Sequence, residues 1–227
     1  MIQEFTPEEL LGPLNDVERK RCPKKLFVAG DKTLFDIHPR VAVVGSRKAS
    51  SDGINRAERI ACLLAKNGVV VVSGLAEGID GAAHKSAISA GGRTIAVLGT
   101  PLDKTYPKSH SELQRQIIHD HAAVSQFQIG HPTQPKNFIM RNGTMALIVC
   151  ASIIVEAGDT SGALSQGWET LRLGRLLFIM ESIFSNTGLR WPNEMLRYGA
   201  QVLSKDNFDS FLEVLPVGKM SDHAFAF

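Results

Sequence analysis

One segment constrains the fold more than any other part of the chain: Val69–Gly99, with the sequence VVVVSGLAEGIDGAAHKSAISAGGRTIAVLG. It begins with Val69–Val72, an unbroken β-branched run typical of a strand buried on both faces of a parallel sheet. A helix is expected from about Ile79 to Gly91, because glycine accepts the left-handed conformation that closes a helix. Thr94–Leu98 is then the next strand. The segment therefore predicts a strand, a turn, a helix and a second, parallel strand.

Three small residues stand in the turn between the first of these strands and the helix. Ser73 and Gly74 follow the strand directly, and Gly78 stands just before the helix. Such a turn places backbone N–H groups and a helix N-terminus at the carboxyl edge of the sheet, where phosphates and nucleotides bind. Glycine allows a ligand to approach the backbone closely, but tight strand–helix packing demands it equally often. A phosphate-binding loop and a packing requirement are both open interpretations here.

The same alternation of strands and helices extends over most of the chain. Further strands are expected at Val41–Val44, Ala122–Ser125, Ser152–Glu156, Leu176–Met180 and Gln201–Leu203. Further helices are expected at 52–66, 109–119, 137–149, 162–173 and 206–214, with Ser109 as an N-cap. Regular alternation predicts an α/β fold with a mostly parallel, doubly wound sheet.

This pattern also defines the expected domain organisation. Residues 1–39 are expected to form a short N-terminal extension, in which Thr6 caps a short helix. Residues 40–215 are expected to form one α/β domain, since a chain of this length can bury a single core. Residues 216–227 are expected to form a C-terminal tail.

The composition excludes several classes of protein. The net charge is only +2, so a nucleic-acid site would have to be a local patch. The three cysteines, at positions 22, 62 and 150, form no C-x-x-C pair, which argues against a disulfide framework or a structural zinc site. No run reaches the ~18 apolar residues of a membrane span, and the polar, acidic N-terminus is unlike a signal peptide. We therefore expect a cytoplasmic protein without a bound metal.

The loop after the Val41–Val44 strand has the sequence Gly45-Ser46-Arg47. Gly45 permits a tight turn, Ser46 can donate to a phosphate, and Arg47 offers a planar fork for bidentate contact. The dinucleotide fingerprint G-x-G-x-x-G is absent. The alternative is that Arg47 pairs with a neighbouring carboxylate, because structural ion pairs often resemble functional sites.

A cation, an aromatic ring and a second cation stand close together at Lys136, Phe138 and Arg141. Binding of single-stranded DNA requires basic groups for phosphates and flat rings for bases, so these residues are the best nucleic-acid candidates. The alternative for Phe138 is a core anchor of its helix.

Two further features belong to the same expected edge of the sheet. Ser161 and Gly162 open a helix after the Ser152–Glu156 strand, which makes a third glycine-containing loop there. Asp80 and His84 stand four residues apart on one face of a helix. They could act as an acid–base pair or as metal ligands, but a hydrogen bond that fixes the loop is favoured, because a metal needs further ligands.

Four segments between Val41 and Arg175 resemble, in order, those of the DprA/Smf proteins, which handle DNA during natural transformation. They are VAVVGSRKASSDG, SGLAEGIDGAAHKSAISAGGRTIAVLG, NFIMRN and VEAGDTSGALSQGWETLRLGR. The resemblance implies a Rossmann-like domain that binds single-stranded DNA and helps to load a RecA-type recombinase, without established catalysis and without a cofactor. It also assigns Arg141 and Asn142 to the family's RN pair.

The chain departs from the family pattern at several positions. Gly143 stands where the family usually has a second arginine, and Gln166-Gly167 replaces a Thr-Ala pair. Glu181-Ser182 stands where the family has Pro-Gly, and Ser125-Gln126 where it tends to have Ser-Glu. These departures indicate a divergent branch.

Three functions follow as hypotheses. The first is a single-stranded DNA-binding protein of the DprA/Smf type, with DNA, a RecA-type recombinase and a second copy of the chain as partners. The second is a small-nucleotide-binding enzyme or sensor related to the LOG phosphoribohydrolases, whose PGGxGTxxE loop corresponds here to GDTSGALSQGWE, with different glycine spacing. The third is a scaffold that binds another protein through the apolar tail. Fold alone does not separate these functions, and the motifs favour DNA.

Overall fold

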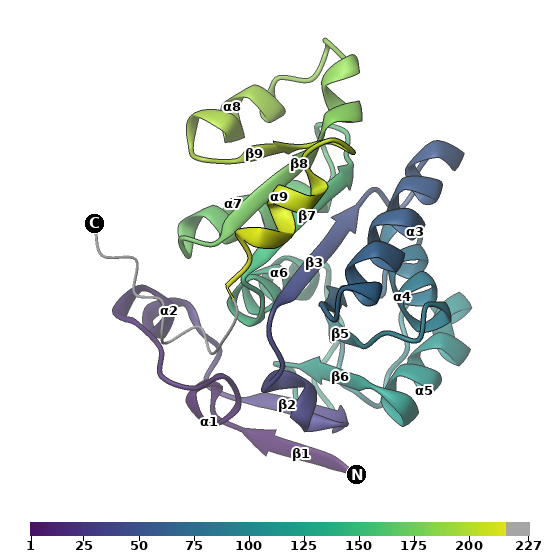
Figure 1. The fold of residues 1–227 in the computed structure, drawn as a ribbon. Coiled ribbons are helices and arrows are strands. Elements are labelled where there is room, and N and C mark those ends of the chain that lie inside the picture. Colours follow the sequence, from purple (N-terminus) through teal and green to yellow (C-terminus); the bar gives the residue numbers. More distant parts are fainter. Residues whose placement is uncertain (217–227) are drawn as a thin grey trace.

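The computed structural model describes residues 1–216 and contains one nine-stranded sheet in the order β1-β2-β6-β5-β4-β3-β7-β8-β9 (Figure 1). The strands are β1 (Ile2–Phe5), β2 (Leu26–Gly30), β3 (Arg40–Gly45), β4 (Val70–Ser73), β5 (Thr94–Leu98), β6 (Ala122–Ser125), β7 (Ala151–Glu156), β8 (Leu176–Met180) and β9 (Gln201–Leu203). Along the order β6-β5-β4-β3-β7-β8-β9, each strand is parallel to its neighbours in that run. The predicted Rossmann-like, doubly wound and mostly parallel sheet is therefore confirmed.

The direction of winding reverses between β3 and β7. The chain runs outward from β3 through β4 and β5 to β6, then returns to place β7, β8 and β9 on the other side of β3. In an open α/β sheet, this reversal opens a crevice outside the carboxyl ends of the strands, which is where ligands bind. The topology therefore locates the candidate site before any side chain is considered.

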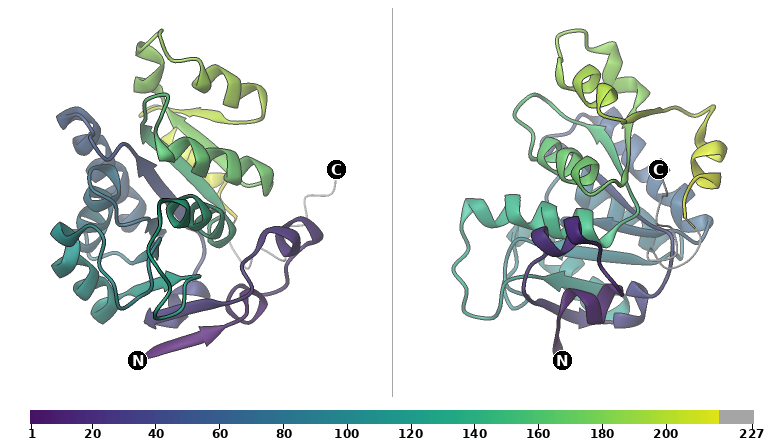
Figure 2. Two further views of the ribbon diagram at one scale, coloured as in Figure 1. Left: turned by 180° about the vertical axis from the view of Figure 1, so that it is seen from behind. Right: turned by 90° about the vertical axis from the view of Figure 1, so that its left-hand side faces the viewer.

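Helices cover both faces of the sheet, as Figure 1 and the reverse view on the left of Figure 2 show. They are α1 (Pro7–Leu11), α2 (Asp16–Arg21), α3 (Ser51–Lys66), α4 (Ile79–Ser89), α5 (Ser111–Asp120), α6 (Pro135–Ile148), α7 (Gly162–Arg172), α8 (Trp191–Arg197) and α9 (Phe208–Glu213). The core under α3, α4 and α9 includes Val41 and Val43, and the core under α6 and α7 includes Ala42 and Val44. This alternation along β3 follows from the period of two in a strand.

The amphipathic pattern of α3 shows why the helices cover the sheet. Its buried residues include Ala57, Ile60, Ala61 and Leu64, which follow the i, i+3, i+4, i+7 spacing of one helix face. Ser50 caps the helix by accepting a hydrogen bond from the amide of Gly53 at 3.0 Å. The helix ends at Asn67-Gly68, where Gly68 has φ +74°.

The first 39 residues contribute two strands to the same sheet. β2 pairs antiparallel with β6, and β1 pairs antiparallel with β2 at one edge (Figure 1). Leu26–Ala29 belongs to the segment that was expected to be a short N-terminal extension, and the structure places it in the sheet. The division of the chain at residue 40 stays a prediction.

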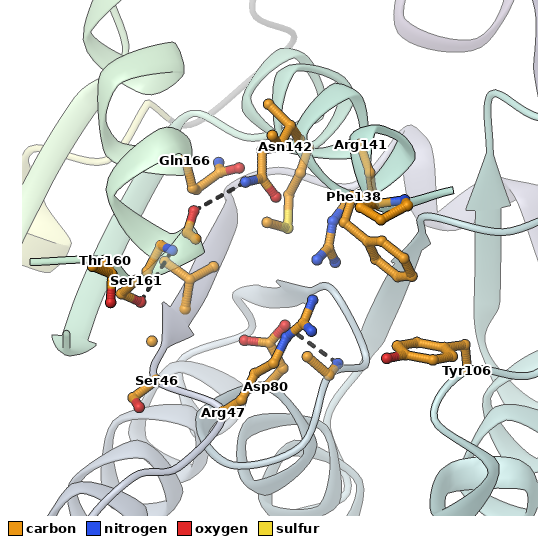
Figure 3. A pocket seen from close by; sticks show the side chains of 18 of the residues that line it. Ser46, Arg47, Asp80, Tyr106, Phe138, Arg141, Asn142, Thr160, Ser161 and Gln166 are labelled. Atoms are coloured by element: carbon orange, nitrogen blue, oxygen red, sulfur yellow. Dashed lines mark hydrogen bonds between the residues drawn. The ribbon is translucent and has the colours of Figure 1, made fainter. Parts of the chain in front are cut away.

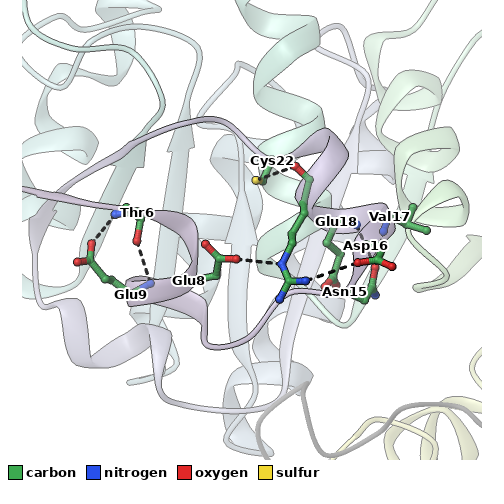
Figure 4. Close-up of polar contacts among 9 residues, drawn as sticks. Thr6, Glu8, Glu9, Asn15, Asp16, Val17, Glu18 and Cys22 are labelled. Atoms are coloured by element: carbon green, nitrogen blue, oxygen red, sulfur yellow. Dashed lines mark hydrogen bonds and ion pairs between the residues drawn. The ribbon is translucent and has the colours of Figure 1, made fainter.

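Capping boxes define the two short N-terminal helices (Figure 4). Thr6 Oγ1 accepts from the amide of Glu9 at 3.2 Å, and Glu9 Oε2 accepts from the amide of Thr6 at 2.7 Å, so the expected cap is confirmed. Asn15 and Glu18 make the same reciprocal pair for α2. Glu18 also forms a largely buried ion pair with Arg175, which ties α2 to the segment after α7.

Two details of the expected elements are wrong. Ser109 is not an N-cap, because a 3₁₀ turn over Lys108–His110 precedes α5 and the Ser109 hydroxyl donates instead to Glu77 Oε1 at 2.9 Å. Helix α8 had no predicted counterpart. The tail proposed for protein binding lies, except for residue 216, outside the described residues.

Candidate nucleic-acid interface

A cleft of about 780 Å³ lies at the point where the winding of the sheet reverses (Figure 3). Its walls come from the loop after β3, the loop after β4, helix α6, and the segment that joins β7 to α7. Within residues 1–216, three cations and one carboxylate line it: Arg47, Lys48, Arg141 and Asp80. The local charge is therefore positive, although the chain as a whole is nearly neutral.

The loop after β3 presents Arg47 to the cleft. Gly45 is required by packing, because a Cβ there would lie 2.5 Å from Ile79 Cγ1 and 2.8 Å from the carbonyl oxygen of Glu156. The amide of Ser46 donates to that same carbonyl at 2.7 Å, which fixes the turn. Arg47 is exposed, and its guanidinium carbon lies 5.4 Å from the centroid of the Phe138 ring. No ion pair joins Arg47 to a carboxylate among the described residues, so the ion-pair alternative is not supported.

The loop after β4 contributes to the site mainly by packing against its other residues, and less by contacting a ligand directly. The Ser73 hydroxyl is buried and donates to the carbonyl of Val43 at 2.6 Å, so it faces the sheet. A side chain at Gly74 would overlap the guanidinium of Arg141. Gly78 has φ +75°, and a Cβ there would lie 2.7 Å from the carbonyl oxygen of Arg47. The glycines therefore allow the Arg47 loop and the Arg141 side chain to approach the β4–α4 turn.

Asp80 holds the loop after β4 in place. Its Oδ2 accepts from the amides of Gly74 at 3.2 Å and Ala76 at 3.4 Å, and the residue is 5% exposed. Burial raises the pKa of this carboxyl, while the positive charge of Arg141 and the amide hydrogen bonds oppose that rise. The predicted loop-structuring role of Asp80 matches this geometry.

His84 does not partner Asp80, which corrects the pairing expected from their spacing. Its Nδ1 is 2.7 Å from Thr94 Oγ1 on β5, and its side chain is fully buried between α4 and the sheet. Burial lowers the pKa of His84 from 6.5 to about 3. The residue stabilises the packing of α4 on β5 in its neutral form.

This neutral histidine predicts a pH dependence of stability. A base whose pKa is lower in the folded state contributes its full stability above the unfolded pKa of 6.5 and loses it as the pH falls toward 3. We expect the free energy of unfolding to fall by about 2 kcal/mol between pH 7 and pH 5 on this account. Urea unfolding of the wild type and His84→Gln at both pH values measures the difference. The variant His119→Gln, at an exposed position, is the matched control. If the free energy of unfolding of His84→Gln fell between pH 7 and pH 5 as much as that of the wild type, the assignment would be contradicted.

Helix α6 supplies the aromatic and cationic side chains of the far wall. Phe138 is half-buried, with its ring over Gly99 and 5.0 Å from the ring of Tyr106. It therefore packs against the loop after β5, as a core anchor does, and also borders the cleft, as a ring that contacts a base must. Lys136 is exposed on the first turn of α6 and does not line the cleft.

Arg141 lies deeper than the sequence suggested. It is 5% exposed, and its Nη1 donates to the carbonyl of Val97 at 3.1 Å, while Nε has no hydrogen-bond partner among residues 1–216. Burial lowers the pKa of Arg141, the charge of Asp80 raises it, and the charge of Arg47 lowers it again. Two guanidinium groups and one carboxylate thus share one end of the cleft (Figure 3). We call this the cationic end: Arg47, Asp80, Phe138 and Arg141.

The opposite wall is the segment that starts α7. Ser161 caps the helix, with Oγ accepting from the amide of Ala163 at 3.3 Å, and Gly162 is exposed. Asn142 Nδ2 donates to the carbonyl of Gly162 at 3.1 Å, which links α6 to α7 across the cleft (Figure 3). Asn142 itself is 6% exposed.

Several residues that line the cleft were not predicted from the sequence, among them Tyr106, Thr160 and Gln166. Tyr106 is 48% exposed and belongs to the loop after β5, which leaves the same edge of the sheet. The position of this loop could have identified Tyr106 from the sequence, because every loop at the carboxyl edge of the sheet is a candidate for ligand binding. Gln166 stood out in the sequence only as a departure from the family pattern.

The described residues offer little for other chemistry. They contain no group of three or more histidine, cysteine or acidic side chains that could hold a metal ion. Asp80, the one carboxylate that lines the cleft in this part of the chain, is occupied by backbone amides. No helix within residues 1–216 has both the length and the apolar character of a membrane span.

The chain resembles known proteins over most of its length. The sequence model of DNA recombination-mediator protein A matches residues 7–215. Protein Smf of Escherichia coli strain K12 is 35% identical over 218 residues, which cover 95% of this chain and 55% of that protein. DprA of Streptococcus pneumoniae strain R6 is 41% identical over 157 residues, which cover 69% of this chain and 55% of that protein. The chain thus spans about half the length of these curated relatives.

Solved structures extend the comparison. DprA of Streptococcus pneumoniae superposes with a TM-score of 0.80 at 32% identity, covering 95% of this chain and 75% of the other. DNA processing protein A of Helicobacter pylori, which binds single-stranded DNA, superposes with a TM-score of 0.77 at 26% identity, covering 95% and 98%. A molybdenum cofactor binding protein of Rippkaea orientalis, at 19% identity and a TM-score of 0.56, shares the fold alone. From the match over residues 7–215 and these relatives, the chain belongs to the DNA recombination-mediator protein A family, which includes the DprA and Smf proteins.

Proposed function

We propose that the cleft binds single-stranded DNA. The observation that carries this proposal is the cationic end, where two guanidinium groups stand beside an aromatic ring in the crevice of the sheet. Arginine forks are suited to phosphate oxygens, and flat rings are suited to unpaired bases. The single-stranded DNA-binding relative from Helicobacter pylori supports the same assignment.

The proposed roles differ between the two arginines. Arg47 is exposed and has no carboxylate partner among the described residues, so it can close on a phosphate as the strand enters. Arg141 is buried and held by Val97, so it offers a preoriented group on the cleft floor. Ser46, Asn142 and the start of α7 at Ser161 and Gly162 complete the polar lining. Lys136, outside the cleft, adds positive charge along the path of the strand.

Within this proposal, the biological role is DNA recombination and DNA uptake in the cytoplasm. A RecA-type recombinase and a second copy of the chain are the proposed protein partners, supported by membership of the family. The proposed activity is binding and not catalysis. A phosphoribohydrolase would need a carboxylate beside the ribose, and Asp80 is instead bound to the amides of Gly74 and Ala76.

Fluorescence anisotropy with a labelled single strand, the matching duplex and mononucleotides tests the proposal. We expect the single strand to bind more tightly than the duplex, because an intact duplex cannot place bases against Phe138 and Tyr106. With ~3–5 phosphates neutralised, the logarithm of affinity should fall against the logarithm of salt concentration with a slope of about −2 to −3.5.

Controls separate the cleft from the general charge of the surface. Arg47→Ala should weaken binding by about tenfold, as expected for one charge-assisted contact, while Arg93→Ala should not. Arg93 is exposed just before β5, at the opposite end of the strand from the cleft. Equal affinity for the duplex, or binding that does not depend on salt concentration, would reject the proposal.

A further inference from the structure

One end of the cleft has a different chemistry from the cationic end. Two side-chain amides, Asn142 and Gln166, line the cleft, as do the apolar residues Val44, Met145 and Ala163. We call these five residues the amide end. An apolar slot with a few directed polar groups is suited to a flat ring and less suited to a phosphate.

Gln166 has an unused acceptor. The residue is 1% exposed, and its Nε2 donates to Ser152 Oγ at 3.2 Å and to Thr170 Oγ1 at 3.4 Å. The Thr170 hydroxyl donates to the carbonyl of Gln166 at 2.9 Å, and with its one proton used there it accepts from the Gln166 side chain and from the Ser152 hydroxyl, 2.8 Å away. This places the nitrogen of Gln166 toward Thr170, and Oε1 has no hydrogen-bond partner in the described part of the chain.

Asn142 is oriented in the same sense. Its Nδ2 donates to the carbonyl of Gly162, which can only accept, so the amide cannot be reversed without losing that bond. Its Oδ1 is therefore the atom left for a ligand (Figure 3). Two residues that line the cleft thus each have a side-chain carbonyl oxygen without a hydrogen-bond partner among residues 1–216, and that of Gln166 is buried.

A buried acceptor that lacks a donor is costly, so this end favours a ligand that brings N–H groups. We propose that the amide end receives one base of the bound strand and favours a base with an exocyclic amino group, that is cytosine, adenine or guanine, over thymine. This inference rests on the proposed binding of single-stranded DNA. An exocyclic amino group carries two hydrogens, one for each oxygen, whereas thymine flanks its single N3–H with two carbonyls that oppose them.

Gln166 is the residue on which this specificity depends most directly. The family resemblance places a Thr-Ala pair where this chain has Gln166-Gly167. A threonine side chain is two heavy-atom positions shorter and would not present a carbonyl oxygen. The base preference is accordingly expected for chains that carry glutamine at this position.

The test compares oligomers of thymidine and 5-methyl-deoxycytidine of equal length, which differ at position 4 and in the N3 proton but share the methyl group. We expect a Kd about five- to tenfold lower for 5-methyl-deoxycytidine, the effect of a pair of base-edge hydrogen bonds. Methylating both hydrogens of the amino group, in N4,N4-dimethyl-deoxycytidine, should remove the advantage in the wild-type protein. Gln166→Leu should also remove the difference between the two oligomers, and the exposed Gln116→Leu should retain it.

The outcomes are distinguishable. Tight binding of both oligomers with equal Kd values would overturn the base preference and leave the proposed function intact. A preference that survives double methylation of the amino group would overturn it as well. Failure of all oligomers to bind would instead overturn single-stranded DNA binding itself.

Discussion

Replacing Arg141 with methionine is expected to lower the affinity for single-stranded DNA by about 10- to 100-fold, the effect of losing a charge-assisted contact. The same change should lower the free energy of unfolding by about 2–4 kcal/mol. It removes the donor to the carbonyl of Val97 and the positive charge that faces the buried Asp80. Urea unfolding and anisotropy titrations of the folded protein measure the two effects separately.

Two further variants show which interaction causes the loss of affinity and which causes the loss of stability. The double variant Asp80→Asn/Arg141→Met should recover part of the stability, because it leaves no unpaired buried charge at this pair, but it should not recover the affinity. Arg47→Met should lose affinity with a change in stability within about 0.5 kcal/mol, because Arg47 is exposed. If Arg141→Met bound DNA as tightly as the wild type per folded molecule, Arg141 would be a structural residue only.

Gly78→Ala is expected to lower the free energy of unfolding by about 3 kcal/mol or more. Gly78 has φ +75°, and its added Cβ would meet two backbone carbonyl oxygens, those of Ser46 and Arg47, which cannot turn away as a flexible side chain can. The loop that carries Arg47 would have to move, so affinity for single-stranded DNA should fall as well.

Gly143→Ala is the matched control for this glycine. Gly143 lies within α6, and a Cβ added there would have no described atom outside its own stretch of helix within 4 Å, so the alanine should raise stability by about 0.5–1 kcal/mol. Urea unfolding of both variants provides the comparison. A Gly78→Ala protein as stable as the wild type would show that the contact between the two loops is unimportant.

The parallel core could be predicted because its signals are local. Val69–Val72 is apolar at every position, as a strand buried on both faces must be, and Gly45 follows its strand at the crevice. The edge strand β1 gave no such signal. Its residues Ile2–Phe5 are mostly exposed, and the strand forms by backbone pairing with β2, which side-chain periodicity does not report.

The sequence predicts which loops form the candidate site, but it does not predict how deeply the side chains of the site are buried. The three loops at Gly45, Gly74 and Ser161 follow from strand order, which the alternation of elements determines. The burial of Arg141 depends on how closely α6 approaches Gly74, and this is a contact between segments far apart in the sequence. His84 likewise contacts Thr94 on a neighbouring strand, and not Asp80 on its own helix.

The central claim is that single-stranded DNA occupies the cleft, and photocrosslinking tests it most directly. An oligonucleotide that carries 5-iodo-deoxyuridine crosslinks to adjacent aromatic rings, and mass spectrometry of the digested complex locates the adduct. We expect adducts at Tyr106 or Phe138, which border the cleft, and none at Tyr198, which is 67% exposed and lies edge-on to Trp168 outside the cleft. Adducts at Tyr198, with none at the cleft residues, would contradict the account.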